Sequence, residues 1–139
     1  MSRDGESNPE LNKLDRNRLG ATASRVTTLA LAWYFSGEEK YAQKATELIR
    51  VWFFDKDTRM NPNLEYAQMI PGHNGGKGRC YGVLDSYSFV EMLDAVKLLE
   101  QSKSFTAKDS KQLQAWFGKL LNWILTSPQG QEESRQANN

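Results

Sequence analysis

Hydrophobic residues recur at helical spacing in four long segments of this chain. The first segment runs from about residue 16 to 35, and its apolar residues fall at steps of three and four, which places them on one helix face. They are Leu19, Ala23, Val26, Ala30 and Trp33. Ser36-Gly37 ends the segment, since glycine adopts the left-handed conformation that closes a helix. The second segment follows at once, from about 38 to 54, so the pair is predicted to form an antiparallel hairpin.

The remaining segments have apolar faces of the same kind. The face predicted for the second segment consists of Tyr41, Ala45, Leu48 and Trp52. The third segment runs from about 85 to 102, and its face consists of Phe89, Met92, Leu93, Val96 and Leu99. The fourth runs from about 107 to 126, and its face consists of Leu113, Trp116, Phe117, Leu120 and Ile124. These two segments predict a second hairpin.

The ends of the fourth segment have their own signals. Thr106 is the expected N-cap, and Asp109 occupies the third helical position, as in a capping box. Pro128 and Gly130 are expected to stop the helix. With no strand pattern and no short-period repeat, the chain is predicted to be all-α, in a helical toroid or a bundle.

A long connection, from Asp55 to Leu84, separates the two hairpins. Connections in compact domains rarely exceed about 12–15 residues unless they are functional or disordered. This one contains enough apolar residues to be held on the scaffold. Its amides, aromatic rings and cations suit a sugar site, because amides pair with hydroxyls and arginine pairs with carboxylates. The candidate binding residues are Asn61, Asn63, Tyr66, Gln68, His73 and Arg79.

Each candidate also has a purely structural interpretation. Asn61-Pro62-Asn63 has the composition of a turn. His73 is the only histidine, and a single histidine in a loop is more often a surface residue than a catalyst. Only the combination of these residues on one loop favours a binding site.

Composition and charge exclude several function classes. Eighteen basic residues nearly balance seventeen acidic ones, so the net charge of +1 indicates neither nucleic acid nor a membrane surface as a partner. Cys80, the only cysteine, is expected to be an inert loop residue. No metal-ligand spacing is visible, and we expect no metal and no other cofactor. The first residues lack the apolar segment of a signal peptide, so either the protein is cytoplasmic or its natural N-terminus lies upstream.

Several motifs together resemble the alginate lyase domain family. The most specific is Thr58-Arg59-Met60-Asn61-Pro62-Asn63-Leu64, followed by Tyr66-Ala67-Gln68 and Ile70-Pro71-Gly72. The others are Arg3-Asp4-Gly5 with Asn8-Pro9, Asp15-Arg16, the stretch from Thr28 to Gly37, the stretch from Trp123 to Pro128, and Asn138-Asn139. The resemblance covers nearly the whole chain.

The resemblance implies an (α/α) toroid of helical hairpins that cleaves 1,4-linked polyuronate, either alginate or a related polymer such as glucuronan, by β-elimination. In the family, an Asn-Asn pair is followed by a histidine that assists catalysis, and a later tyrosine transfers protons. By this resemblance Asn139 neutralises the uronate carboxylate as a catalytic residue, and Asn138 binds substrate. Residues 1–139 would then be a partial, incomplete toroid domain, cut at its C-terminal end and also at its N-terminal end, and inactive alone.

Further expectations follow from this interpretation. The full-length protein would be periplasmic or secreted, where such polymers occur. The chain would associate with itself through faces that missing hairpins would cover. The alternative function is a non-catalytic carbohydrate-binding helical protein, and a helical scaffold for protein contacts fits the long polar loop least well.

Overall fold

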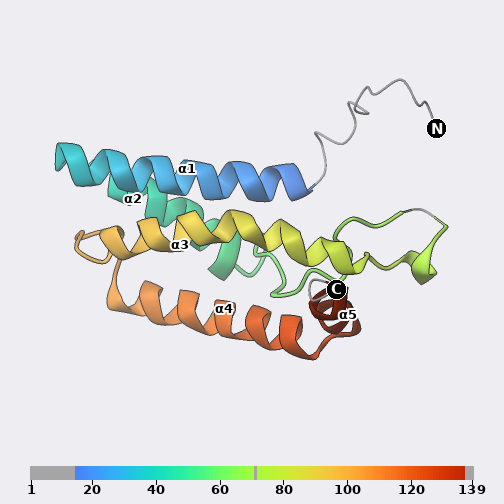
Figure 1. The fold of residues 1–139 in the computed structure, drawn as a ribbon. Coiled ribbons are helices and arrows are strands. Elements are labelled where there is room, and N and C mark those ends of the chain that lie inside the picture. Colours follow the sequence, from blue (N-terminus) through green and yellow to red (C-terminus); the bar gives the residue numbers. More distant parts are fainter. Residues whose placement is uncertain (1–14, 71, 137–139) are drawn as a thin grey trace, which may run out of the picture.

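The computed structural model of the chain describes residues 15–70 and 72–136, and within these ranges all regular structure is helical. The α-helices are α1 (Asp15–Ser36), α2 (Glu39–Ile49), α3 (Ser88–Leu99), α4 (Ala107–Thr126) and α5 (Pro128–Gln136) (Figure 1). A π-helical turn, η2 (Arg50–Phe54), continues α2, and two 3₁₀ segments, η3 (Asn74–Gly76) and η4 (Cys80–Tyr87), lie in the long connection. Each of the four predicted helical segments is therefore present.

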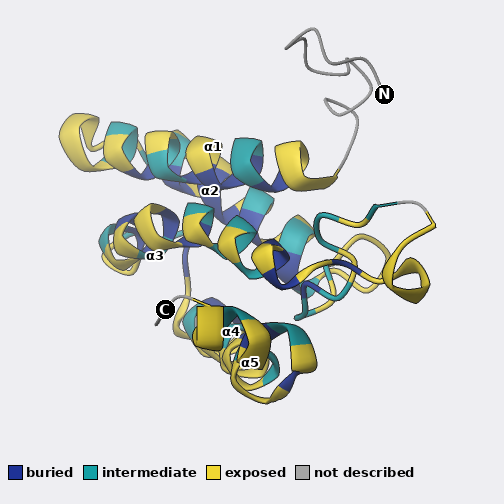
Figure 2. Ribbon diagram, turned by 45° about the vertical axis from the view of Figure 1, so that its right-hand side comes forward, coloured by how far each residue is buried: buried dark blue, intermediate teal, exposed yellow. Residues whose placement is uncertain are grey.

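The first hairpin forms as predicted. Gly37 adopts a φ of 71° and its N–H donates to the carbonyl of Trp33 at 2.8 Å, which closes α1 and lets α2 start at Glu39. Helix α1 lies against both α2 and α3. Figure 2 shows that the buried residues gather where these three helices face one another, while the outer side of α1 is exposed.

Four aromatic rings join the hairpins. Phe53 of η2 lies with its ring centroid 4.8 Å from Trp116 and 5.6 Å from Phe117, both on α4, and 5.9 Å from Phe89 of α3. Phe89 contacts Trp116 and Phe117 in turn, so α3 and α4 meet through these side chains. Phe53, Phe89 and Trp116 are buried, so this aromatic cluster is the part of the core that fixes the second hairpin against the first.

The predicted N-cap of α4 is confirmed. The Thr106 hydroxyl accepts from the Asp109 N–H, and the Asp109 side chain accepts from the Thr106 N–H at 2.8 Å, which completes a capping box. The predicted apolar faces of α1, α3 and α4 are also correct. Their members are either buried or packed against the core.

The predicted face of α2 is confirmed in part: Ala45 is buried, and Leu48 and Trp52 pack against the core. The buried residues are Ala42, Ala45, Thr46, Ile49 and, beyond α2, Phe53. The sequence holds two overlapping stripes with helical spacing, and the fully buried one lies one position from the predicted one. It begins with alanines, whose small side chains suit close packing of α2 against α1, and Tyr41 lies half-buried at the flank.

The predicted stop of the fourth helix is confirmed, since α4 ends at Thr126. The sequence pattern did not predict the further helix that follows, because Pro128 begins α5. The Ser127 hydroxyl accepts from the Gly130 N–H at 3.1 Å, so Ser127-Pro128 acts as the N-cap and first residue of a new helix. Gly130 is required for space: a Cβ there would lie 1.7 Å from the carbonyl oxygen of Ile124. Helix α5 therefore turns sharply off α4 and packs against η4.

The third predicted helix begins later than expected. The α-helix α3 starts at Ser88, and the preceding residues from Cys80 form the 3₁₀ segment η4. The long connection is thus more ordered at its end than the sequence suggested, and this end carries much of the candidate site.

Candidate functional site

The long connection is fixed to the helical scaffold at its beginning. The Met60 N–H donates to the carbonyl of Trp52 at 2.8 Å, and the carbonyl of Met60 accepts from the Trp116 indole at 3.0 Å. The Thr58 hydroxyl donates to the carbonyl of Val51 at 2.6 Å, and Leu64 is buried. The partners Val51 and Trp52 belong to η2 and Trp116 belongs to α4, so these contacts fix the start of the loop to both hairpins.

The two halves of the loop then pack against each other through glycines. The Gly78 N–H donates to the carbonyl of Glu65 at 2.7 Å, and a Cβ at Gly78 would lie 2.2 Å from the carbonyl oxygen of Ala67. A Cβ at Gly82 would lie 2.7 Å from the same oxygen. These two glycines permit a backbone approach that any side chain would block. Lys77 and Glu65 form an ion pair at 2.9 Å across the same contact.

A polar network ties this loop to α1. The Asp85 carboxylate accepts from Arg16 Nε at 3.0 Å and from Gln68 Nε2 at 3.1 Å, and its side chain is only 4% exposed. Gln68 Nε2 also donates to the carbonyl of Tyr81 at 3.1 Å, and Gln68 Oε1 accepts from Arg79 Nη2 at 3.3 Å. The Arg79 guanidinium lies 5.7 Å from the centre of the Tyr81 ring. We call Arg16, Gln68, Arg79, Tyr81 and Asp85 the Asp85 network.

Gln68 adopts a left-handed backbone conformation, with a φ of 54°. This conformation is costly for a residue with a side chain, by about 1 kcal/mol or more, and it persists only where surrounding contacts enforce it. Here the side chain makes hydrogen bonds at both its nitrogen and its oxygen. Strain of this kind is often found at functional sites, so Gln68 is the most distinctive residue of the loop.

The structure brings together two of the residues predicted from the sequence and leaves the others apart. Gln68 and Arg79 meet in the Asp85 network. Tyr66 is 65% exposed. His73 is exposed, and only its backbone bonds locally: its N–H donates to the carbonyl of Ile70 and its carbonyl accepts from the Gly76 N–H, both at 3.1 Å.

Asn63 and Asn61 have the turn geometry that their sequence context allows. Asn63 Oδ1 accepts from the Glu65 N–H at 3.2 Å, and the Asn63 N–H donates to the carbonyl of Asn61 at 2.8 Å. The Asn61 side chain remains exposed. Asn138 and Asn139 lie outside the described residues.

Sequence reasoning missed Asp85 and Arg16 as members of the site. The sequence predicts Asp85 at the start of one helix and Arg16 in the first turn of another, far away in the chain. Their pairing depends on α1 lying against α3, which no local pattern reveals. The one available signal was the resemblance of Asp15-Arg16 to the family motif.

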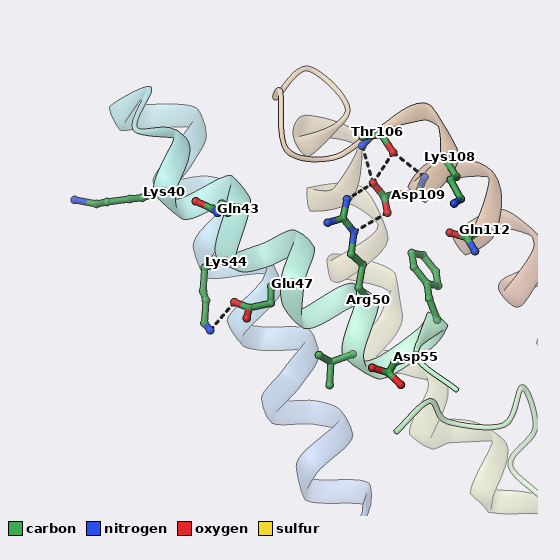
Figure 3. Close-up of a pocket in the computed structure, with 12 residues that line it drawn as sticks. Lys40, Gln43, Lys44, Glu47, Arg50, Asp55, Thr106, Lys108, Asp109 and Gln112 are labelled. Atoms are coloured by element: carbon green, nitrogen blue, oxygen red, sulfur yellow. Dashed lines mark hydrogen bonds and ion pairs between the residues drawn. The ribbon is translucent and has the colours of Figure 1, made fainter. Parts of the chain in front are cut away.

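A second charged cluster, between α2 and the start of α4, serves structure. It lies in an open cavity of about 960 Å³ (Figure 3). Arg50 binds the Asp109 carboxylate with Nε at 2.9 Å and Nη2 at 2.8 Å, and the N–H and hydroxyl of Thr106 donate to the same carboxylate. The hydrogen bonds from Arg50 and Thr106 hold the pKa of Asp109 well below its usual range, despite burial. Lys44 pairs with Glu47 at the rim at 2.7 Å.

Cys80 is buried, and burial is the main reason that the pKa of its thiol is raised. A raised pKa disfavours the thiolate, so the structural interpretation of Cys80 is supported. Across residues 15–70 and 72–136, no group of three or more histidine, cysteine, aspartate or glutamate side chains is arranged to hold a metal ion. Among the helices in these ranges, none combines the length and apolarity that crossing a membrane requires.

Comparisons with known proteins extend this description. The chain is similar to an alginate lyase from Bacteroides ovatus, whose crystal structure it matches with a TM-score of 0.91 and 56% sequence identity. The match covers 97% of this chain and 36% of that enzyme's chain, so the chain spans little more than a third of that enzyme's length. No curated protein matches the sequence.

The predicted fold class is confirmed: the chain is all-α, with the helical hairpins of an incomplete (α/α) toroid. The profile of the alginate lyase family matches residues 1–139. The chain therefore belongs to the alginate lyase family.

Proposed function

We propose that this chain is part of a polysaccharide lyase that cleaves 1,4-linked polyuronate, alginate or a related polymer such as glucuronan, by β-elimination. The observation that carries the proposal is the family match over the whole chain, together with 56% identity to a protein described as an alginate lyase. The loop geometry is compatible with it, since Arg79 contacts the Gln68 amide and the Tyr81 ring, and Tyr66 is exposed on the same loop.

The chemistry explains which groups are needed. A base removes the proton at C5 of a uronate, the electron pair forms the C4–C5 double bond, and the C4–O bond breaks. The leaving oxygen then takes a proton from an acid. The carboxylate beside C5 gains negative charge during this step, so a neutral donor there stabilises the transition state, as in an oxyanion hole, by about 3 kcal/mol. We assign this role to Asn139.

The remaining roles in this chain concern binding. Arg79 would pair with a substrate carboxylate, and Gln68 orients its guanidinium through the 3.3 Å hydrogen bond. Tyr66 offers an exposed ring on which a sugar can stack. Asn61, Asn63 and His73 supply further polar groups on the same loop, and Asn138 would bind beside Asn139. The proton-transfer groups would come from residues that follow Asn139, so we expect the 139-residue chain alone to be inactive.

A lyase assay tests this proposal. We expect a chain extended past Asn139 to the length of the Bacteroides ovatus enzyme to raise the ultraviolet absorbance of polyuronate, as unsaturated uronates form. The 139-residue chain should give no rise, and Asn139→Ala in the longer chain should lower kcat by about two orders of magnitude. Binding of polyuronate without any absorbance rise from the longer chain would favour the alternative, a non-catalytic carbohydrate-binding protein.

Two further expectations, on the location of the protein and on its self-association, belong to the same proposal. A polyuronate lyase would meet its substrate in the periplasm or outside the cell. Self-association of this chain would use large apolar side chains that are exposed on the described helices. Among these, Phe35 on α1 is 81% exposed and Leu125 on α4 is 65% exposed.

A further inference from the structure

A broad groove of about 1200 Å³ runs beside the first half of α1. Its walls come from α1, η2, η4 and the first residue of α3, and they include Arg16, Arg18, Arg25, Trp52, Asp85 and Tyr87. None of the loop residues predicted from the sequence to bind substrate lines it. The groove is therefore a separate surface that meets the loop site only at the Asp85 network.

We propose that this groove is a second binding site, which holds carboxylate-bearing sugars of an anionic polysaccharide through Arg18, Arg25 and Arg16. The inference rests on the proposed function, because it takes the ligand to be the same class of polymer. The groove on α1 and the loop site would together form a path along which a polymer chain is held.

The side chains that line the groove carry more positive than negative charge, so cationic groups remain available to an anionic ligand. Among the described residues that line the groove, Asp85 is the one carboxylate, and it is already paired with Arg16 Nε. The Arg16 side chain is nevertheless 67% exposed. A guanidinium has five N–H donors, so a single bond to Asp85 fixes the orientation of Arg16 and leaves further donors for a second carboxylate.

Arg18 and Arg25 are less engaged than Arg16. Arg18 lies 3.5 Å from Asp15, and both side chains are largely exposed, so solvent weakens this pair. Arg25 is exposed, and its side chain makes no hydrogen bond or ion pair within the described residues. The two arginines are two helical turns apart on one face, roughly 10 Å along the axis. This spacing suits two charges along a polymer better than one isolated anion.

The aromatic residues of the groove fit a sugar. Tyr87 is 76% exposed, and its ring offers a flat surface on which an apolar sugar face can stack. Trp52 contributes an indole N–H that is buried and has no acceptor in the part of the chain that the structure describes. Buried donors normally have a partner, so this N–H is an unmatched polar group beside the groove, and its environment should respond to ligand binding.

Asp85 connects the groove to the loop site. It accepts from Arg16 on the groove side and from Gln68 on the loop side, and Gln68 holds Arg79. A polyuronate that occupied the groove would thus lie beside the residues assigned to the loop site. A structural role alone would need only the Arg16–Asp85 pair, and it gives no reason for Arg18 and Arg25 to face the same groove.

Titration of the 139-residue chain with an alginate tetrasaccharide, followed by NMR, tests the groove. The Trp52 indole signal, assigned with Trp52→Phe, is the local readout. We expect the double variant Arg18→Gln, Arg25→Gln to weaken binding by roughly tenfold or more, since it removes two charge-assisted contacts. The control variant Lys111→Gln, Lys119→Gln removes the same charge from exposed positions on α4 and should bind like the unmodified chain.

The outcomes separate the inference from the proposed function. Equal weakening by both double variants, or none by either, would overturn the groove while the lyase assay on the longer chain still decides the proposed function. Equal binding of the neutral cellotetraose would overturn the requirement for carboxylates. A tetrasaccharide that does not bind the unmodified chain would overturn the groove, and a longer chain that also lacks lyase activity would count separately against the proposed function.

Discussion

Two regions of the molecule each contain a buried aspartate that binds an arginine, but they use the pair differently. At the scaffold junction between η2 and α4, Asp109 receives two N–H groups from Arg50 and two further donors from Thr106. In the Asp85 network, Asp85 receives one N–H from Arg16 and one from Gln68. The two aspartate side chains are equally buried, at 5% and 4% exposed.

The two pairs differ in how many N–H groups of the arginine remain available to a ligand. At the scaffold junction the bidentate contact uses the guanidinium of Arg50 and closes a helix cap, so the cluster contributes to stability. In the Asp85 network the arginine is bound by one nitrogen and stays exposed, beside a strained glutamine and an open groove. A buried carboxylate can therefore either complete a fold or orient a cation for a ligand, and the number of donors around it distinguishes the two roles.

The largest effect on stability is expected in the aromatic cluster, at Phe53, which lies beside the scaffold junction. Phe53→Ala removes a ring that is 2% exposed and contacts three other aromatic rings, so it should lower the free energy of unfolding by about 3–5 kcal/mol. Urea denaturation followed by circular dichroism measures this. Phe35→Ala, at an 81% exposed position, is the matched control and should change stability by less than about 0.5 kcal/mol. A loss of stability below about 1 kcal/mol for Phe53→Ala would show that the aromatic cluster does not hold the two hairpins together.

The Asp109 pair should have the next largest effect. Asp109→Ala removes the capping box and leaves Arg50 unpaired, which should cost about 2–3 kcal/mol near neutral pH. The folded-state pKa of Asp109 is lowered, so its contribution is fully present above the unfolded value of about 3.9 and is lost as the pH falls towards the folded-state pKa.

Urea denaturation at several pH values tests the sign of this dependence. The difference in stability between the unmodified chain and Asp109→Ala should be constant from about pH 5 to 7 and should shrink below about pH 4. Asp94→Ala, at an exposed position on α3, is the control and should change stability by less than about 0.5 kcal/mol near neutral pH. A difference that grows on acidification would contradict the assignment of a lowered pKa.

The smallest effect on stability is expected for the Asp85 network. Asp85→Asn should lower the free energy of unfolding by only about 1 kcal/mol, because its partner Arg16 is largely exposed. Hydrogen exchange at the Gly78 and Gly82 amides should nevertheless become faster, since the loop loses its tie to α1. Asp57→Asn, an exposed position near the start of the loop, should leave this exchange unchanged. If Asp85→Asn destabilised the chain as much as Asp109→Ala, the distinction between the two regions would be lost.

The site was predictable only in part, for a physical reason. Gln68 and Arg79 stood out because unusual residue types gathered on a loop too long to be a simple connection. Their partners Asp85 and Arg16 belong to helix starts, and only the packing of α1 beside α3 brings them to the loop. Asn138 and Asn139 remain predictions from the family resemblance.

Features that depend only on neighbouring residues were predictable from the sequence alone. Helical periodicity, the Gly37 turn and the Thr106–Asp109 capping box are local, and the structure has each of them where the pattern predicts. Packing selected which of two overlapping stripes α2 buries most fully, and it brought Asp85 into contact with both α1 and the loop. Both outcomes depend on groups distant in the sequence, whose meeting is set by packing and not by local preference. The start of α5, in contrast, had a local signal in Ser127 as the N-cap before Pro128.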